Sequence, residues 1–180
     1  MKHLATLMMA TMTLVVLAAC TSSTPAPTPQ QTDVAEGAYG GFAVDPPADD
    51  DIVLTIVGPQ TQEYTYAELQ KRATVEITID EPFVRLTQTF TAVPLAELFA
   101  EAGITADATV ETIALNDYRY AAGVQSWIEG DALLAVLRDG ELIPMDAGGP
   151  IRIVFDTSSP QFATIDAWNW SLRSIEVITS

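Results

Sequence analysis

The stretch from Asp146 to Phe155 constrains the fold more than any other part of the sequence. Its paired glycines, Gly148 and Gly149, let the backbone approach another group closely or take a positive φ, and Pro150 then restricts the next φ. The residues that follow, Ile151-Arg152-Ile153-Val154-Phe155, are apolar except for one arginine, which is typical of a strand buried on both faces. A tight bend leading into a core strand either holds a ligand or is purely structural, and the sequence leaves both interpretations open.

The hydrophobic pattern from residue 52 onward alternates between short strands and short helices. Helices are predicted after the capping box Thr65-Tyr66-Ala67-Glu68, from Pro94 to Gly103, and at a second capping-box pattern, Ser126–Glu129. Strands are predicted at 52–57, 74–79, 83–90, 109–115, 132–137, 151–155 and 175–178. We therefore expect an α+β fold over residues 52–180, with irregular mixed β-sheets and two or three short helices around one core.

The N-terminus has the pattern of an export signal. Lys2 precedes an uncharged apolar run from Leu4 to Ala19, which is short for a membrane span and typical of a signal peptide over residues 1–19. The next residues, Leu17-Ala18-Ala19-Cys20, resemble the bacterial lipobox, which implies diacylglyceryl attachment to Cys20 and cleavage before it. A plain signal peptide followed by an incidental cysteine is the alternative. Residues 20–51, rich in Pro, Ser and Thr, are predicted to form a disordered tether.

Cysteine and histidine are nearly absent. Cys20 is the only cysteine, and the only histidine, His3, lies in the predicted signal peptide. The domain therefore has no thiolate or imidazole for a zinc site, a Ser-His-Asp triad or a Cys-His pair.

The chain is strongly acidic. Lys and Arg total 8 against 24 Asp and Glu, so the formal net charge is −16, and −17 once Lys2 is removed with the signal peptide. Such a charge repels phosphate backbones and anionic lipid surfaces, so we expect no nucleic-acid partner. Contact with the bilayer is expected through the acylated Cys20, which places the protein at the cell membrane facing the periplasm or the exterior.

Several segments of the domain, taken in order, resemble a known family. They are 91–98, Asn116-Asp117-Tyr118, 133–140, 149–155 and the late run 168–177. Their order and spacing resemble the molybdopterin-binding oxidoreductase domain, which has the sulfite oxidase fold, and in particular its small exported bacterial members. The likeness covers about residues 52–178.

The resemblance implies a molybdenum pterin held between loops by backbone amides and arginines. The residues expected to contact it are Asn116, Asp117, Tyr118, Arg119, Gly148, Gly149 and Arg152. In catalytic members a cysteine thiolate ligates the molybdenum, and the domain of this chain has no cysteine, so no catalytic or metal-ligating residue is predicted.

Two of the expected site residues and the nearby tryptophans also have a structural interpretation. Asp117 is suited to capping its own turn, and Arg152 to pairing with a nearby carboxylate. The tryptophans are suited either to core packing or to forming a stacking wall for a planar ring. The carboxylates considered for Arg152 are Asp117, Asp131, Asp139, Glu141 and Asp146, and the tryptophans are Trp127, Trp168 and Trp170.

Three functions remain open on the sequence. The favoured expectation is a membrane-anchored lipoprotein whose molybdopterin-binding-like domain is a non-catalytic module for a small ligand or an envelope protein partner. The second is a molybdopterin-dependent oxidoreductase whose metal lacks a protein thiolate. The third is a purely structural surface protein without a ligand pocket.

Overall fold

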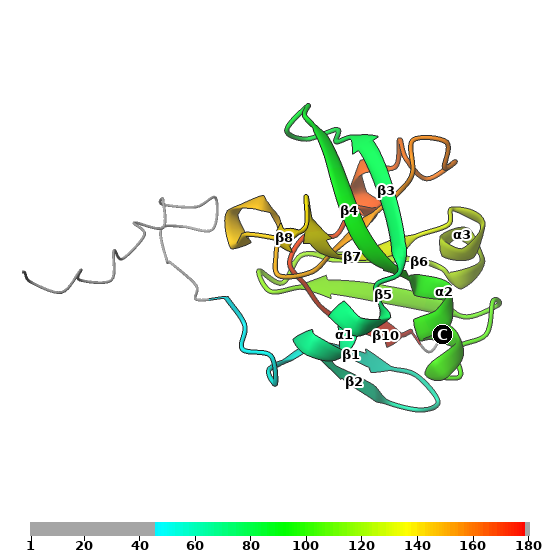
Figure 1. The fold of residues 1–180 in the computed structure, drawn as a ribbon. Coiled ribbons are helices and arrows are strands. Elements are labelled where there is room, and N and C mark those ends of the chain that lie inside the picture. Colours follow the sequence, from blue (N-terminus) through cyan, green and yellow to red (C-terminus); the bar gives the residue numbers. More distant parts are fainter. Residues whose placement is uncertain (1–45, 179–180) are drawn as a thin grey trace, which may run out of the picture. The chain divides into compact units, whose positions relative to one another are not determined.

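A computed structural model describes residues 46–178 of the chain (Figure 1). The predicted signal peptide, Cys20 and most of the predicted tether lie outside the described residues. None of the helices within residues 46–178 is long and apolar enough to span a bilayer.

Two five-stranded sheets form the domain. The first has the strand order β2-β1-β10-β5-β6, in which β1 and β10 are parallel and the other pairs antiparallel. Its strands are β1 (Ile52–Val57), β2 (Gln62–Thr65), β5 (Thr109–Ala114), β6 (Arg119–Gly123) and β10 (Leu172–Val177). The last strand of the domain thus pairs with the first, which ties the two ends of the fold together.

The second sheet is antiparallel, with the order β3-β4-β7-β8 and with β9 also paired to β7. Its strands are β3 (Val75–Asp80), β4 (Thr87–Pro94), β7 (Leu133–Arg138), β8 (Glu141–Leu142) and β9 (Arg152–Val154). In Figure 1 the β3–β4 hairpin extends well beyond the rest of its sheet.

Short helices complete the fold. They are α1 (Tyr66–Arg72), α2 (Leu95–Glu101) and α3 (Val124–Glu129), with two 3₁₀ turns, η1 (Met145–Ala147) and η2 (Ile165–Ala167). This arrangement confirms the predicted α+β class, with irregular mixed sheets and three short helices.

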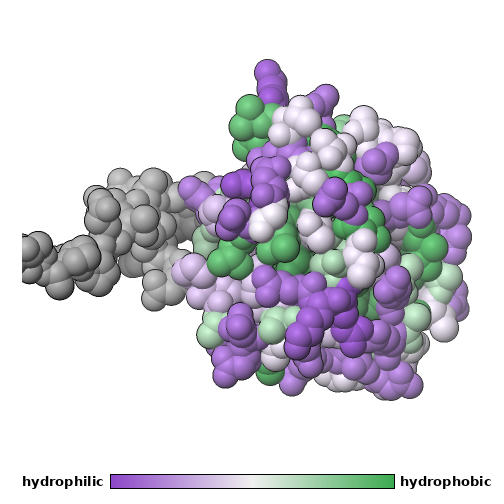
Figure 2. Space-filling view, in the orientation of Figure 1, coloured by the Kyte–Doolittle hydropathy of each residue, from purple (hydrophilic) through white to green (hydrophobic). Residues whose placement is uncertain are grey.

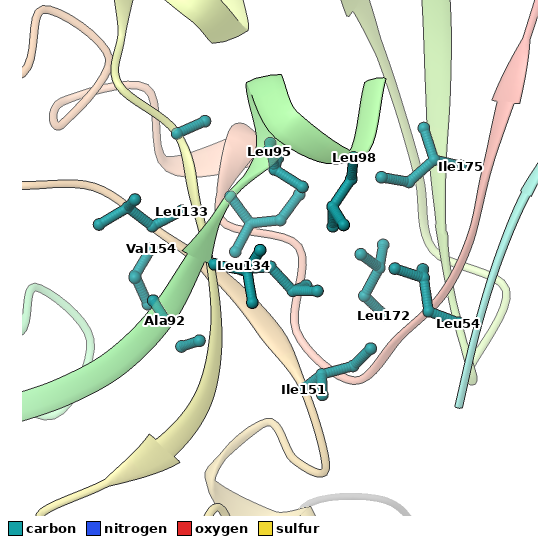
Figure 3. Packing of buried hydrophobic residues seen from close by; sticks show 14 of the residues in the cluster. Leu54, Ala92, Leu95, Leu98, Leu133, Leu134, Ile151, Val154, Leu172 and Ile175 are labelled. Atoms are coloured by element: carbon teal, nitrogen blue, oxygen red, sulfur yellow. The ribbon is translucent and has the colours of Figure 1, made fainter. Parts of the chain in front are cut away.

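Apolar side chains from both sheets and from α2 meet in one core. Figure 3 shows Leu54, Leu172 and Ile175 of the first sheet and Leu134 and Val154 of the second, with Leu95 and Leu98 of α2 among them. All seven are fully buried. The core therefore fixes the loops that follow β3, β5 and β9, because each of those strands is anchored in it.

The closing strand predicted at 175–178 begins earlier, at Leu172, and two further predicted boundaries were wrong for identifiable reasons. The strand predicted at 83–90 begins only at Thr87, because the carboxylate of Glu81 accepts the amides of Phe83 and Val84 and turns the chain there. The helix predicted from Ser126 begins at Val124, and the Ser126 hydroxyl donates to the carbonyl of Gly123 instead of capping a helix N-terminus. The Thr65–Glu68 capping box is confirmed.

Candidate functional site

The glycine bend before β9 is packed too tightly for side chains. Gly148 has φ +86°, and a Cβ on it would lie 2.7 Å from the ring of Trp170. A Cβ on Gly149 would lie 1.8 Å from the carbonyl oxygen of Ile143. Their amides already donate within the chain, Gly148 to Met145 at 3.2 Å and Gly149 to Pro144 at 2.9 Å. A ligand anion therefore reaches neither amide unless the bend gives up a hydrogen bond.

Arg152 lies inside the fold, on β9. Its side chain is 2 % exposed, Nη2 donates to Oε1 of Glu81 at 2.7 Å, and Nη1 donates to the carbonyl of Ala147 at 3.1 Å. Its guanidinium carbon lies 4.1 Å from the ring centroid of Trp170. The predicted carboxylate partner is confirmed in kind, but it is none of the five carboxylates near the bend.

Glu81 follows β3 and is fully buried. While one oxygen accepts from Arg152, the other accepts the amides of Phe83 and Val84, each at 2.8 Å. Breaking such a buried pair is costly, because the remaining charge is then left without its counter-ion in a low-dielectric interior. Glu81 thus neutralises Arg152 and shapes the 81–86 turn at once. The sequence gives no sign of this pair, because 71 residues separate the two partners.

The loop after β5 is organised by its own side chains. Oδ1 of Asn116 accepts the amide of Tyr118 at 3.1 Å, so the turn is capped by Asn116 and not by Asp117 as expected. Asp117, at φ +63°, instead accepts from Arg173 at 2.6 Å. Arg119 pairs with Glu111 across β5 and β6 at 2.5 Å. Both arginines near the loop are therefore paired with carboxylates of the chain.

Ser171 joins the loop to the glycine bend. Its amide donates to the carbonyl of Gly148 at 2.7 Å, and its carbonyl accepts the amide of Leu115 at 2.8 Å. The two predicted halves of the site are thus brought together through the segment before β10. Residues next to this junction line two hollows.

The larger hollow has a volume of about 630 Å³ and lies beside the parallel pair β1 and β10. Leu115, Met145, Pro150 and Leu172 give it an apolar wall. Its charged lining residues are Asp51, Arg173 and Glu176, so carboxylates outnumber its single cation.

The smaller hollow, about 330 Å³, is here called the aromatic groove. Residues of three separate segments line it: Phe83, Asn116, Tyr118, Ile165, Asp166, Trp168 and Trp170. Phe83 meets both indoles edge to face, with ring centroids 5.9 Å from Trp168 and 5.1 Å from Trp170. Figure 2 shows hydrophobic side chains near the end of the β3–β4 hairpin, where Phe83, Val84 and Leu86 are exposed. Phe83 thus meets the two indoles at steep angles instead of in a parallel stack, and part of its own ring remains exposed.

Tyr118 and Asp166 form the polar rim of the aromatic groove. The Tyr118 hydroxyl donates to the backbone carbonyl of Asp166 at 3.1 Å. Partial burial and then the negative charge of Asp166 raise the pKa of Tyr118. No lysine or arginine lines the groove.

The family of the chain follows from its sequence. Residues 43–179 match the family described as "Oxidoreductase molybdopterin binding domain", and the chain therefore belongs to that family. This confirms the resemblance that the sequence motifs indicated. No curated protein matches the chain at a significant level.

Molybdopterin, the cofactor that the family name implies, can be tested against these residues. Its phosphate is anionic. In the catalytic members of the family that the sequence resembles, a cysteine thiolate ligates its metal. Residues 46–178 contain no cysteine or histidine and no cluster of three or more potential metal ligands. Their buried arginine is neutralised by Glu81, and both hollows carry carboxylates. The donor set does not fit the cofactor, and no reaction step is derived through it.

Proposed function

We propose that the chain is a membrane-anchored lipoprotein whose domain binds a small ligand without catalysing a reaction. The observation that carries this proposal is the buried ion pair between Arg152 and Glu81. The pair commits one of the two arginines expected to contact the cofactor to the fold itself, and it shapes the turn that presents Phe83 to the aromatic groove.

The proposed anchor is the acylated Cys20, followed by the tether up to residue 51. Acyl chains contribute about 0.8 kcal/mol per buried CH₂, so two or more chains hold a protein stably at a bilayer. The lipobox resemblance supports a location of the domain outside the cytoplasmic membrane, facing the periplasm or the exterior. An acidic domain is repelled by anionic headgroups, so the tether would keep it in solution near the membrane, where it meets small ligands or an envelope protein.

A second candidate is a molybdopterin-dependent oxidoreductase whose metal is held by the pterin sulfurs alone. Membership of the molybdopterin-binding family favours it. It would require an electron-transfer partner, because residues 46–178 offer no histidine for a haem. It also requires an anionic cofactor to bind next to carboxylates, which makes it the less favoured of the two.

The deciding experiment is molybdenum and pterin analysis of the full chain isolated from its own envelope. The proposal predicts neither stoichiometric molybdenum nor the fluorescence of oxidised pterin. One molybdenum and one pterin per chain would overturn it in favour of the oxidoreductase. A molybdopterin enzyme purified from the same cells in parallel shows that the maturation machinery is active and that the assay detects the cofactor.

A separate experiment tests the anchor. Cys20→Ala should move the protein from the membrane fraction to the soluble fraction and abolish incorporation of labelled fatty acid. Thr21→Ala, at the neighbouring position, should change neither. If the Cys20→Ala variant were cleaved and carried no acyl chain but still stayed in the membrane fraction, the lipid anchor would be contradicted.

A further inference from the structure

We propose that the aromatic groove binds a small organic cation of the quaternary ammonium class. This inference names the ligand class of the site in the proposed function, and it rests on that function. Three independent features of the groove support it: its rings, its charge and the way Phe83 is held.

The rings supply the surface that such a cation requires. An ammonium group is attracted to the faces of indole, phenol and phenyl rings by their quadrupoles, and aromatic boxes recognise quaternary ammonium ions in this way. Phe83 stands at 73° to Trp168 and 70° to Trp170, and all three side chains line one hollow, in which Phe83 is 41 % and Trp168 only 3 % exposed. The Tyr118 ring, 41 % exposed, lines the same space.

Arg152 shows that this cluster already accommodates a cation. Its guanidinium carbon lies 4.1 Å from the ring centroid of Trp170 and 6.0 Å from that of Phe83. Glu81 neutralises that charge at 2.7 Å, so the guanidinium does not leave the neighbouring groove positively charged.

The groove itself is negative. Asp166 lines it, and no ion pair among residues 46–178 uses the Asp166 carboxylate. Arg173 on β10 is paired with Asp117, and Arg119 on β6 is paired with Glu111. Neither carboxylate lines the groove. The acidity of the whole chain adds a long-range attraction for cations. The same charges oppose an anionic ligand.

Glu81 is the positioning residue of the groove. It holds the amides of Phe83 and Val84 and thereby orients a ring that is 41 % exposed and sits on a turn. Ordering an exposed aromatic ring costs conformational entropy. Because the fold already orders Phe83, ligand binding does not have to supply this cost again. The volume of about 330 Å³ suits a small molecule, since it lies at the lower end of the usual range for ligand pockets.

The test is calorimetric titration of the full chain, in a non-ionic detergent without choline groups, with choline. We expect saturable binding of one choline per chain, with 3,3-dimethylbutanol, its uncharged isostere, at least about tenfold weaker. Phosphocholine distinguishes the sources: comparable affinity indicates that a lipid headgroup is also accepted, and weaker affinity indicates a free ammonium compound. No saturable choline binding up to about 10 mM, or equal binding of the uncharged isostere, would overturn the proposal.

Variants locate the binding. Asp166→Asn should weaken choline binding about five- to tenfold, and Phe83→Leu about three- to tenfold, since each removes one part of the attraction. Asp146→Asn is the matched control, because Asp146 is the exposed central residue of η1 as Asp166 is of η2, and it lines neither hollow. Circular dichroism checks that each variant is folded. If Phe83→Leu does not fold, Tyr118→Leu replaces it as the ring variant. Equal affinity of Asp166→Asn and Asp146→Asn would place the cation elsewhere and overturn the proposal.

The outcome is distinguishable from failure of the proposed function. Absence of choline binding from a chain that also lacks molybdenum and pterin would remove only the ligand class. Stoichiometric molybdopterin would remove the non-catalytic function whatever the choline result.

Discussion

The buried corner around Arg152 and the aromatic groove share Trp170 but differ in every property that matters for binding. In the corner, the guanidinium of Arg152 is neutralised by Glu81 and the glycine amides are used by the bend. In the groove, the Phe83 and Tyr118 rings are exposed, and the Asp166 carboxylate is in no ion pair with a cation of the described chain. The groups that suit an anion are therefore used for folding, whereas the surface left for a ligand suits a cation.

The strongest test of the closed corner is Gly149→Ala. The new Cβ would lie 1.8 Å from the carbonyl oxygen of Ile143, a clash only relieved by moving backbone, so we expect a loss of about 4 kcal/mol or more, or failure to fold. Gly123→Ala is the control, since nothing lies within 4 Å of its Cβ position, and it should change stability by less than about 0.5 kcal/mol. Urea unfolding measures both, and equal midpoints would contradict the packing described for the bend.

Glu81→Ala tests the buried pair that links the two regions. Removing the carboxylate leaves the guanidinium buried, so the free energy of unfolding should fall by about 3–5 kcal/mol. Glu111→Ala removes the partner of Arg119 in a half-exposed pair and should cost less than about 1 kcal/mol. If the two variants were equally stable, the Arg152 pair would not be the element that closes the corner.

Tyr66, the first residue of α1, is expected to make a smaller contribution to the free energy of unfolding, and this contribution depends on pH. Its hydroxyl donates to the carbonyl of Val136 at 2.9 Å, and burial raises its pKa from 10.0 to about 12. Because the folded state holds the proton more tightly, this contribution is complete below pH 10 and is lost as the pH rises to 12 and beyond. The free energy of unfolding should fall by about 2 kcal/mol over that range, and Tyr66→Phe should flatten the fall. A profile identical in the variant would assign the alkaline loss to other groups.

The smallest effect is expected at a site remote from both regions. Thr65→Ala removes the cap of α1 and should cost about 1 kcal/mol without altering choline affinity. Thr65→Ser keeps the hydroxyl and should restore most of that stability in thermal unfolding. An altered choline affinity in Thr65→Ala would show that the groove is sensitive to global stability, and the groove variants would then need correction for it.

The features that the sequence predicts correctly are those whose determining contacts are local. The Thr65–Glu68 capping box joins residues three apart, so its pattern is visible in the sequence. The bend at Gly149 was predicted for the same reason. That its amides are occupied by Pro144 and Met145 was not, because glycines that fold a loop and glycines that hold an anion have the same sequence pattern.

The aromatic groove could not be assembled from the sequence. Its lining comes from the turn after β3, the loop after β5 and the segment around η2, which only the packing of two sheets brings together. The sequence suggests Trp168 and Trp170 as one possible stacking wall, but it predicts a strand at Phe83 and indicates no role for Asp166. The signal that was available is an aromatic residue flanked by charges and a proline at the start of a predicted strand, which indicates a turn more than a strand.

The most direct measurement is an NMR titration of the full chain labelled at tryptophan and arginine, first with choline and then with inorganic phosphate. We expect choline to shift the indole signals of Trp168 and Trp170 saturably and to leave the Trp127 indole signal on α3 unchanged. We expect phosphate to leave the Arg152 guanidinium signal in place. A saturable shift of Arg152 with phosphate, and none of the groove indoles with choline, would contradict it and make the corner the ligand site.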